Sequence, residues 1–210
     1  MSWHHVMQRD DSGGGWMIDD ADAAAFVSAL RRSCTAHALE VQAYCVLPRH
    51  VHLLVRAPHG IGPEAALLDG ATRSPDGRPP LAVPIVARRH LVVASRYIHL
   101  NPVVAGLVLR PEVWPHSSFG AYLGRPAPRG WPTTDPVLGY FGSMGARHRY
   151  RAFVIAGLSP GTRDGRGRPR WGDAFPPGSA AEDAAWRIES GPAPRPRRLV
   201  AHHVDLPEVP

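Results

Sequence analysis

The chain contains no lysine, and each of its 24 basic residues is an arginine. It has only two cysteines, Cys34 and Cys45, too few for the disulfide framework that stabilises many small secreted domains. The most apolar stretch is interrupted by Pro84 and the pair Arg88–Arg89, which argues against a membrane-spanning helix. No signal peptide is recognisable in the polar start MSWHHVMQRDD. These absences predict a cytoplasmic protein with reduced thiols and no membrane partner.

The composition that remains is that of a folded, basic protein. Hydrophobic residues make up 44% of the 210 residues, enough for one domain with a substantial core. The formal net charge of +6 favours a polyanionic partner such as nucleic acid. Abundant arginine, alanine, glycine and proline also follow from a GC-rich coding sequence, so the charge supports nucleic-acid binding without establishing it.

The character of the chain changes after residue 158. From 159 to 210 the sequence is rich in glycine, proline and arginine, as in GTRDGRGRPRWGD and GPAPRPRRLV. Such a segment cannot bury enough apolar surface to offset the entropy lost on ordering. We therefore predict one folded domain over 1–158 and a disordered basic tail over 159–210.

Apolar periodicity within 1–158 predicts both strands and helices. The pattern predicts a strand over 3–8, a helix over 21–37, a strand hairpin over 39–47 and 50–56, and a helix over 86–101 that Pro102 ends. Residues 57–80 are rich in glycine, proline and aspartate and predict a loop with one short helical piece at 63–68. An apolar element at 103–109, interpreted as a strand, and smaller packing elements at 114–123 and 135–158 follow.

His50 and His52 lie in AYCVLPRHVHLLVRA and flank the single apolar residue Val51. Because side chains alternate along a strand, the two imidazoles leave on one face and Val51 leaves on the other. This spacing suits the binding of one divalent metal from a rigid platform. An HxH triplet is common, so its interpretation depends on a third ligand and a nucleophile elsewhere.

Tyr97 and Asn101 are four residues apart in SRYIHLNPVVAGLV, which puts them one turn apart on the same side of a helix. If this helix crosses the hairpin, Asn101 completes a metal site with His50 and His52. Two imidazoles and an amide oxygen suit Mg²⁺ or Mn²⁺ acting as a Lewis acid on a phosphodiester. Tyrosine is a poor nucleophile at its free pKa of about 10 and becomes useful beside an activated phosphate.

Structural interpretations compete with these assignments. Taken alone, Tyr97 is a half-buried core tyrosine and Asn101 is a helix C-cap. Cys34, His37 and Cys45 could form a zinc site, although a pair of structural thiols is the better interpretation.

Other histidines are weaker candidates. His90 falls on the Tyr97 side of its helix, where a solvated or packed side chain is the simpler interpretation. The pairs His4–His5 and His202–His203 are expected at an edge or in the tail, without a third partner.

Several arginines and tryptophans could contact DNA. Arginine binds phosphates through two parallel hydrogen bonds, although a solvated helix face is an equally good interpretation. The candidate DNA contacts are Arg49, Arg88, Arg89 and Arg96. Trp114 and Trp131 could stack on bases, but packing is the better interpretation of both.

Three parts of the chain resemble one family of single-strand transposases. YCVLPRHVHLLV resembles the HUH metal motif, in which U is a hydrophobic residue. RYIHLNPVVAGLV resembles the tyrosine motif of the REP-associated tyrosine transposases and their insertion-sequence-200-like relatives. WPHSSFGAYLG, TTDPVLGYFG and YRAFVIAG resemble the downstream block of that family. The resemblance covers residues 3–158 with the motifs in the family's order.

The resemblance implies a ferredoxin-like α+β sandwich, an antiparallel sheet with helices packed on it. It implies that Tyr97 attacks a single-stranded DNA phosphate, forming a 5′-phosphotyrosine and freeing a 3′-hydroxyl. His50 and His52 would hold Mg²⁺ or Mn²⁺, with Asn101 completing the site. The expected partner is single-stranded or hairpin DNA, and the expected location is the cytoplasm, in association with the nucleoid. Whether the chain acts alone or as a homodimer is left open.

Two departures from the family pattern bear on activity. Arg49 stands where relatives usually have asparagine, which alters the mouth of the site and not its ligands. Residues 57–90 are shorter than in relatives, and the block that helps to position DNA is reduced to DGRPPLAVPIVARRH. A catalytically decayed protein that binds hairpin DNA is therefore the alternative to an endonuclease and transposase. An HxH hydrolase of small molecules fits less well, because it needs further histidine and aspartate ligands.

Overall fold

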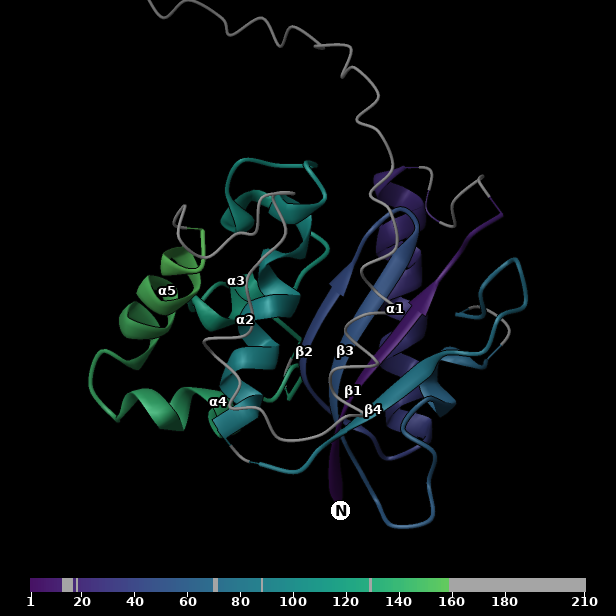
Figure 1. Cartoon of the computed structure of the whole chain (residues 1–210), viewed down its shortest axis with the longest axis horizontal. Coiled ribbons are helices and arrows are strands. Elements are labelled where there is room, and N and C mark those ends of the chain that lie inside the picture. The colour runs from purple at the N-terminus through teal and green to yellow at the C-terminus, as the bar shows by residue number, and fades with distance from the viewer. Residues whose placement is uncertain (13–16, 18, 70–71, 88, 129, 159–210) are drawn as a thin grey trace, which may run out of the picture. The chain divides into compact units, whose positions relative to one another are not determined.

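A computed structural model describes residues 1–12, 17, 19–69, 72–87, 89–128 and 130–158 of the chain. Its centre is a four-stranded antiparallel sheet of order β2-β3-β1-β4 (Figure 1). The strands are β1 (Ser2–Arg9), β2 (Glu40–Val46), β3 (His50–Ala57) and β4 (Leu81–Ile85). The predicted tail, 159–210, lies outside the described residues.

The connections between strands follow the ferredoxin-like pattern. Helix α1 (Asp20–Ala36) connects β1 to β2, and β3 lies between these two strands in the sheet. In its described part, the connection from β3 to β4 contains one 3₁₀ turn, η1 (Ala65–Leu67), which packs against α1. This arrangement confirms the predicted α+β sandwich, with one of its two crossovers reduced to a short turn.

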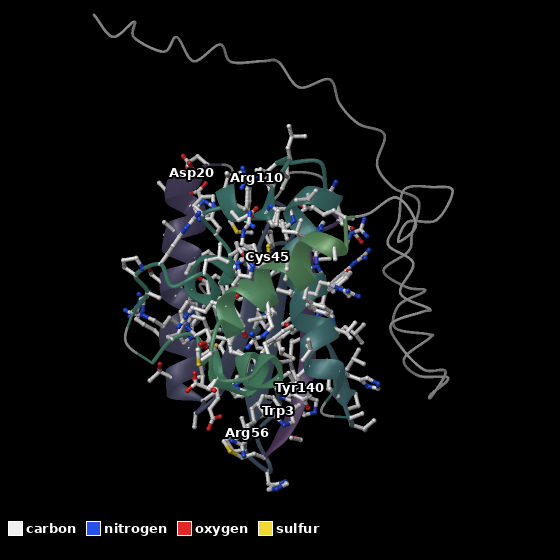
Figure 2. All side chains as sticks on the ribbon, turned by 90° about the vertical axis from the view of Figure 1, so that its left-hand side faces the viewer. Trp3, Asp20, Cys45, Arg56, Arg110 and Tyr140 are labelled. Atoms are coloured by element: carbon white, nitrogen blue, oxygen red, sulfur yellow. The ribbon has the colours of Figure 1, made fainter. Side chains whose placement is uncertain are left out.

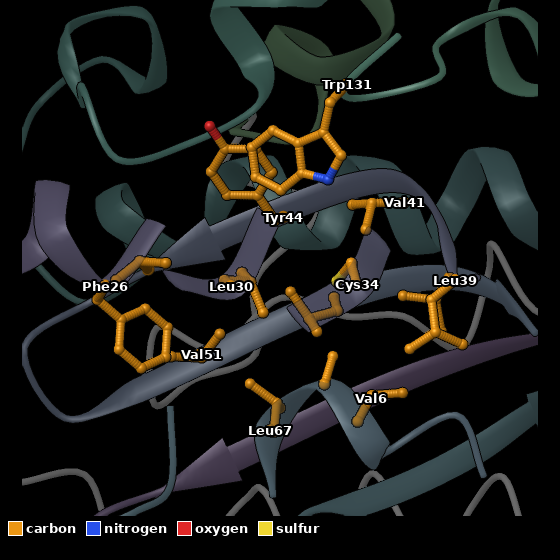
Figure 3. Packing of buried hydrophobic residues seen from close by; sticks show 14 of the residues in the cluster. Val6, Phe26, Leu30, Cys34, Leu39, Val41, Tyr44, Val51, Leu67 and Trp131 are labelled. Carbon is orange, nitrogen blue, oxygen red and sulfur yellow. The ribbon is translucent and has the colours of Figure 1, made fainter. Parts of the chain in front are cut away.

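Helix α1 covers one face of the sheet (Figure 3). The Asp19 side chain accepts a hydrogen bond from the Asp22 backbone N–H at 2.8 Å and so caps the start of the helix. Phe26 and Leu30 are buried at the predicted helical spacing and pack with Val51 of β3. The predicted first helix and its apolar face are confirmed.

Helices from the second half of the chain cover the opposite face (Figure 1). The longer ones are α2 (Arg89–Val104) and α5 (Ala146–Ala156). Shorter pieces complete the layer: η2 (Pro111–Val113), α3 (Phe119–Tyr122), α4 (Asp135–Leu138) and η3 (Gly139–Phe141). Leu54 of β3, Ile98 of α2 and Tyr150 of α5 are fully buried in this second core.

The segment 114–118 runs along the outer edge of β2. The Val46 N–H donates to the carbonyl of His116 at 2.9 Å, and the Ser118 N–H donates to the carbonyl of Tyr44 at 3.0 Å. The Trp114 indole N–H donates to the carbonyl of Val46 at 2.9 Å. These bonds satisfy backbone groups that an edge strand would leave open, and Trp114 has the packing role expected of it.

A buried polar network fastens α2 to this edge. The Tyr44 N–H donates to Ser118 Oγ at 2.8 Å, and Ser118 Oγ lies 2.7 Å from His99 Nε2. The other ring nitrogen of His99, Nδ1, lies 2.6 Å from the Tyr150 hydroxyl of α5. His99 is fully buried and lies between Tyr97 and Asn101, the two side chains of α2 that concern function.

The structure corrects several predicted elements. Residues 81–85 form a strand, β4, in a stretch where the sequence predicted none. Helix α2 begins at Arg89, three residues later than predicted, and continues past Pro102 to Val104. The predicted strand at 103–109 is wrong, because Gly106 adopts a left-handed conformation (φ 72°) just after the helix ends. No helix among the described residues is long and apolar enough to cross a membrane.

Replacing Ser118 by alanine tests the network that anchors α2. The Tyr44 N–H and His99 Nε2 both lose their side-chain partner, so the free energy of unfolding should fall by about 1–3 kcal/mol in urea titrations. Ser28→Ala, which removes an exposed hydroxyl from α1, is the matched control and should change the value by less than about 0.5 kcal/mol. Equal effects of the two substitutions would show that the network does not stabilise the fold.

Candidate metal and tyrosine site

The pairing of β1 with β3 places three histidines on one face of the sheet. His50 is opposite Arg9, His52 is opposite Met7, and His5 is opposite Leu54, which belongs to the core beneath α2. Paired residues point to the same side of an antiparallel sheet, so all three imidazoles face the α2 layer.

Their level in the sheet can be followed in Figure 2. There Trp3 and Arg56, which pair in β1 and β3, lie together at one end of the sheet. Cys45, which pairs with His52 from β2, lies well away from that end.

His50 and His52 are arranged as the alternation predicts. Their ring centroids are 5.7 Å apart and their planes are at 87°. Two imidazoles that bind one ion at about 2.1 Å have centroids roughly 5 Å apart, so a small movement would let both rings share a cation. His52 is buried, at 2% exposure, whereas His50 at the start of β3 is partly exposed.

Tyr97 of α2 lies against the rings of His52 and His5. Its ring meets His52 edge-on, with centroids 5.4 Å apart and planes at 89°. It also meets His5, with centroids 5.7 Å apart. The structure therefore brings the predicted nucleophile and the predicted metal pair together from separate elements.

His5 is a member of this cluster that the sequence did not indicate. Its Nε2 lies 3.1 Å from Nδ1 of His52, and the side chain is 6% exposed. The expectation that the pair His4–His5 lies at an edge without a partner is wrong for His5, because β1 is an inner strand. His4 points to the other face by alternation.

Burial keeps the three imidazoles neutral. It lowers the pKa of His5 from 6.5 to about 4. It also lowers the pKa of His50 to about 4, helped by the positive charges of Arg9 and Arg49 and opposed by the Arg49 backbone and Asp11. The pKa of His52 is lowered well below its usual value, first by burial and then by its histidine neighbours. A neutral imidazole retains a lone pair, the form that binds a metal ion.

Asn101 lies one helical turn after Tyr97 and is 6% exposed. Its amide Nδ2 donates to the carbonyl of Tyr97 at 3.1 Å, which fixes the side chain and leaves the oxygen Oδ1 as the atom for a ligand. Within the described residues, no group of three or more His, Cys, Asp or Glu side chains is arranged to hold a metal. A three-ligand site at this place therefore needs the amide oxygen.

The donor set fits a hard or borderline divalent cation. His50 and His52 would supply neutral nitrogens, and Asn101 would supply an oxygen. The Nδ1 atom of His50 is buried and makes no hydrogen bond to a described side chain, although the Arg49 backbone lies near the ring.

The four candidate arginines have different surroundings. Arg49 borders His50 and donates to the carbonyl of Asp10 through Nε and a terminal nitrogen. The guanidinium of Arg96 lies over the Phe153 ring of α5, 4.3 Å from its centroid, and therefore packs on that helix. Arg88 and the side chain of Arg89 are outside the described part of the chain.

Other predicted side chains have structural roles. The zinc site of Cys34, His37 and Cys45 is excluded, because Cys34 lies in the α1 core and Cys45 in the core on the opposite face. His90 is buried near the start of α2. Trp131 stacks on Tyr44, with centroids 4.6 Å apart. The pair His202–His203 falls outside the described residues.

Comparison with known proteins gives one informative likeness. No family model matches the sequence, and no curated protein matches it. Among solved structures, the chain is similar to that of a REP-associated tyrosine transposase bound to a REP hairpin. The TM-score is 0.51 at 18% sequence identity, over 59% of this chain and 80% of the other. The two chains share a fold.

The desolvated histidines make stability depend on pH. In the unfolded chain they take up protons as the pH falls below about 6.5, whereas His5 and His50 in the folded chain resist protonation until about pH 4. The contribution of these histidines to the free energy of unfolding should therefore be fully present above about pH 6.5. It should decrease as the pH falls, with a slope of up to about 1.4 kcal/mol per pH unit for each histidine.

Urea titrations between pH 7 and pH 4.5 measure this slope. His50→Asn should make the dependence shallower by up to one such histidine contribution. His148→Asn, which removes an exposed histidine from α5, should retain the wild-type slope. A free energy of unfolding that stays constant over this range would contradict the neutral, buried state of the imidazoles.

Proposed function

We propose that the chain is a metal-dependent single-strand DNA endonuclease and strand transferase of the tyrosine transposase type. The observation that carries the proposal is the meeting of Tyr97 with the His50–His52 pair, with the Tyr97 and His52 rings 5.4 Å apart. If Tyr97 were only a core residue, nothing would require a pair of histidines beside it. If the histidines were only structural, nothing would require a tyrosine beside them. The shared fold with a tyrosine transposase supports the same interpretation.

His50, His52 and the Oδ1 atom of Asn101 would hold the divalent cation, Mg²⁺ or Mn²⁺. Bound there, such a cation would act as a Lewis acid on an oxygen of the scissile phosphodiester. The protein contributes ligands that are already neutral at pH 7, so binding requires no proton to leave them. The hydrogen bond from Asn101 to the Tyr97 carbonyl couples the third ligand to the helical turn that carries the nucleophile.

Tyr97 would perform the covalent step. Its phenolic oxygen attacks the phosphorus, an O–P bond forms to the tyrosine, and the bond from phosphorus to the 3′ oxygen of the leaving strand breaks. The tyrosine loses its hydroxyl proton and the departing 3′ oxygen gains one, so the step consumes no net proton. Attack by a 3′-hydroxyl on the phosphotyrosine reverses the step and joins strands, which is the chemistry of transposition and recombination.

Single-stranded or hairpin DNA is the proposed partner. The structural neighbour is described as bound to a REP hairpin, and the present chain carries a formal net charge of +6. Arg9 and Arg49 lie close enough to His50 to lower its pKa, although Asp11, which pairs with Arg9 at 2.7 Å, offsets part of this positive charge. Phosphates passing His50 would meet this charge.

A second candidate function is the binding of hairpin DNA without cleavage. The reduced crossover between β3 and β4 favours it, because η1 has only three residues where relatives are expected to place a helix. Both functions use the same surface. They differ in whether Tyr97 reaches the phosphate, and covalent capture separates them.

Substitution of the histidine pair tests the metal site. The double variant His50→Ala with His52→Ala should lose Mn²⁺ binding, measured by electron paramagnetic resonance, and should lose hairpin nicking. Asn101→Ala should weaken both effects less, because a water molecule can replace an amide ligand on a hard cation. His148→Ala, at an exposed position on α5, is the matched control and should bind Mn²⁺ as the wild type does. Full Mn²⁺ affinity in the double variant would place the metal elsewhere.

Covalent capture tests the nucleophile. With a labelled hairpin strand and Mn²⁺, the wild-type chain should form a 5′-phosphotyrosine adduct that survives denaturing electrophoresis. Tyr97→Phe removes one oxygen at nearly constant volume, so hairpin binding should persist while the adduct disappears. Tyr140→Phe removes a hydroxyl from a 44% exposed tyrosine and should leave adduct formation unchanged.

The two remaining outcomes distinguish the alternatives. An adduct formed by Tyr97→Phe would refute Tyr97 as the nucleophile. A wild-type chain that binds hairpins and never forms the adduct would establish the non-enzymatic function.

A further inference from the structure

The hydrogen bond between His5 and His52 joins two histidines from neighbouring strands. Nε2 of His5 and Nδ1 of His52 are 3.1 Å apart, while the ring centroids are 5.3 Å apart with planes inclined by only 18°. Nitrogens much closer than the centroids, in nearly parallel rings, indicate that the two imidazoles meet through their edges. One ring must then donate an N–H and the other must accept it.

The direction of this hydrogen bond decides what His52 can bind. If His5 donates, the single proton of neutral His52 is on Nε2, the ring nitrogen that the contact with His5 leaves for a cation. If His52 donates from Nδ1, its Nε2 carries a lone pair instead. Only the second arrangement lets a neutral His52 bind a cation together with His50.

The surroundings of His5 suit an acceptor. The side chain is 6% exposed, so little water competes for its nitrogen. The ring of Tyr97 contacts both His5 and His52, with centroids 5.7 and 5.4 Å away, and so restricts the rotation of each.

We propose that His5 is a positioning residue that accepts the Nδ1–H of His52 and thereby fixes the tautomer in which Nε2 of His52 faces the cation site. The inference rests on the proposed function and extends it by a residue from β1 that carries no metal itself. Histidines that bind metals commonly donate their other N–H to a carboxylate, a backbone carbonyl or water. Here a neutral imidazole takes that place.

A neutral acceptor has a chemical consequence. A carboxylate behind His52 would bring a negative charge into the site and repel the phosphate that the site is to bind. His5 orients the ligand without that charge, which leaves the full charge of the cation to act on the substrate. The arrangement suits a site whose substrate is itself an anion.

The tautomer can be measured directly in the metal-free full-length chain. Long-range ¹H–¹⁵N correlation spectra distinguish protonated from unprotonated ring nitrogens of each histidine. We expect Nδ1 of His52 and Nδ1 of His5 to carry the protons at pH 7. A proton on Nε2 of His52 would overturn the proposal without any reference to metal or DNA.

Substitutions of His5 extend the test. His5→Gln offers an amide oxygen near the position of Nε2, so His52 should keep its tautomer and Mn²⁺ affinity should stay within about threefold of the wild type. His5→Leu offers no acceptor, so the tautomers of His52 should mix and Mn²⁺ affinity should fall by about 10- to 100-fold. Met7→Leu, which changes the residue opposite His52 at nearly constant volume, is the matched control and should alter neither.

The outcomes separate positioning from mere packing. If His5→Leu and His5→Gln lose Mn²⁺ affinity equally, or if His52 keeps its Nδ1 proton in His5→Leu, His5 does not set the tautomer. If His5→Leu does not fold, the wild-type spectrum and the rescue by glutamine still decide. A correct tautomer without any DNA adduct would reject the endonuclease and leave the role of His5 intact.

Discussion

The antiparallel pairing of β1 with β3 is the interaction on which the rest of the structure depends. Its register sets His5 opposite Leu54 and His52 opposite Met7, and so aligns three imidazoles on one face. A shift by one residue would turn every side chain of a strand to the other face. It would expose Val51 to the polar cluster and drive histidines into the α1 core, where an unpaired polar group costs about 1–3 kcal/mol. The hydrophobic effect and the geometry of the site therefore select the same register.

Helix α2 carries both the side chain that anchors it and the tyrosine that contacts the histidines. His99 is tied to Ser118 and Tyr150, whereas Tyr97, two residues earlier, contacts the histidines of the sheet. Successive residues of a helix point about 100° apart. His99 can therefore anchor the helix on one side while Tyr97 points in another direction, toward the histidines. An error of about an ångström in such placement can cost on the order of a hundredfold in rate. The buried network thus supports the proposed chemistry from outside the site.

Much of the fold and part of the site could be predicted from the sequence, and the misses have physical causes. Alternation in β3 and the helical spacing of Phe26 and Leu30 are local signals, and both predictions are confirmed. Strand β4 was missed because PLAVPI contains prolines, which an edge strand tolerates. His5 was missed because its partner, His52, is on another strand. The spacing of residues within one strand does not predict its register with a strand that is distant in sequence. The binding of the cation and the formation of the phosphotyrosine stay predictions.

The segment 114–118 along β2 has a consequence for how this protein meets other copies of itself. It occupies the backbone groups on one rim of the sheet. The opposite rim belongs to β4, where Pro84 lacks the N–H that an added strand would need. Neither edge of the sheet therefore favours the addition of a further strand, the step that leads to fibrils or to a sheet shared between copies. Among the residues that the structure describes, a second copy would therefore meet this sheet more readily through side chains than by adding a strand to a rim.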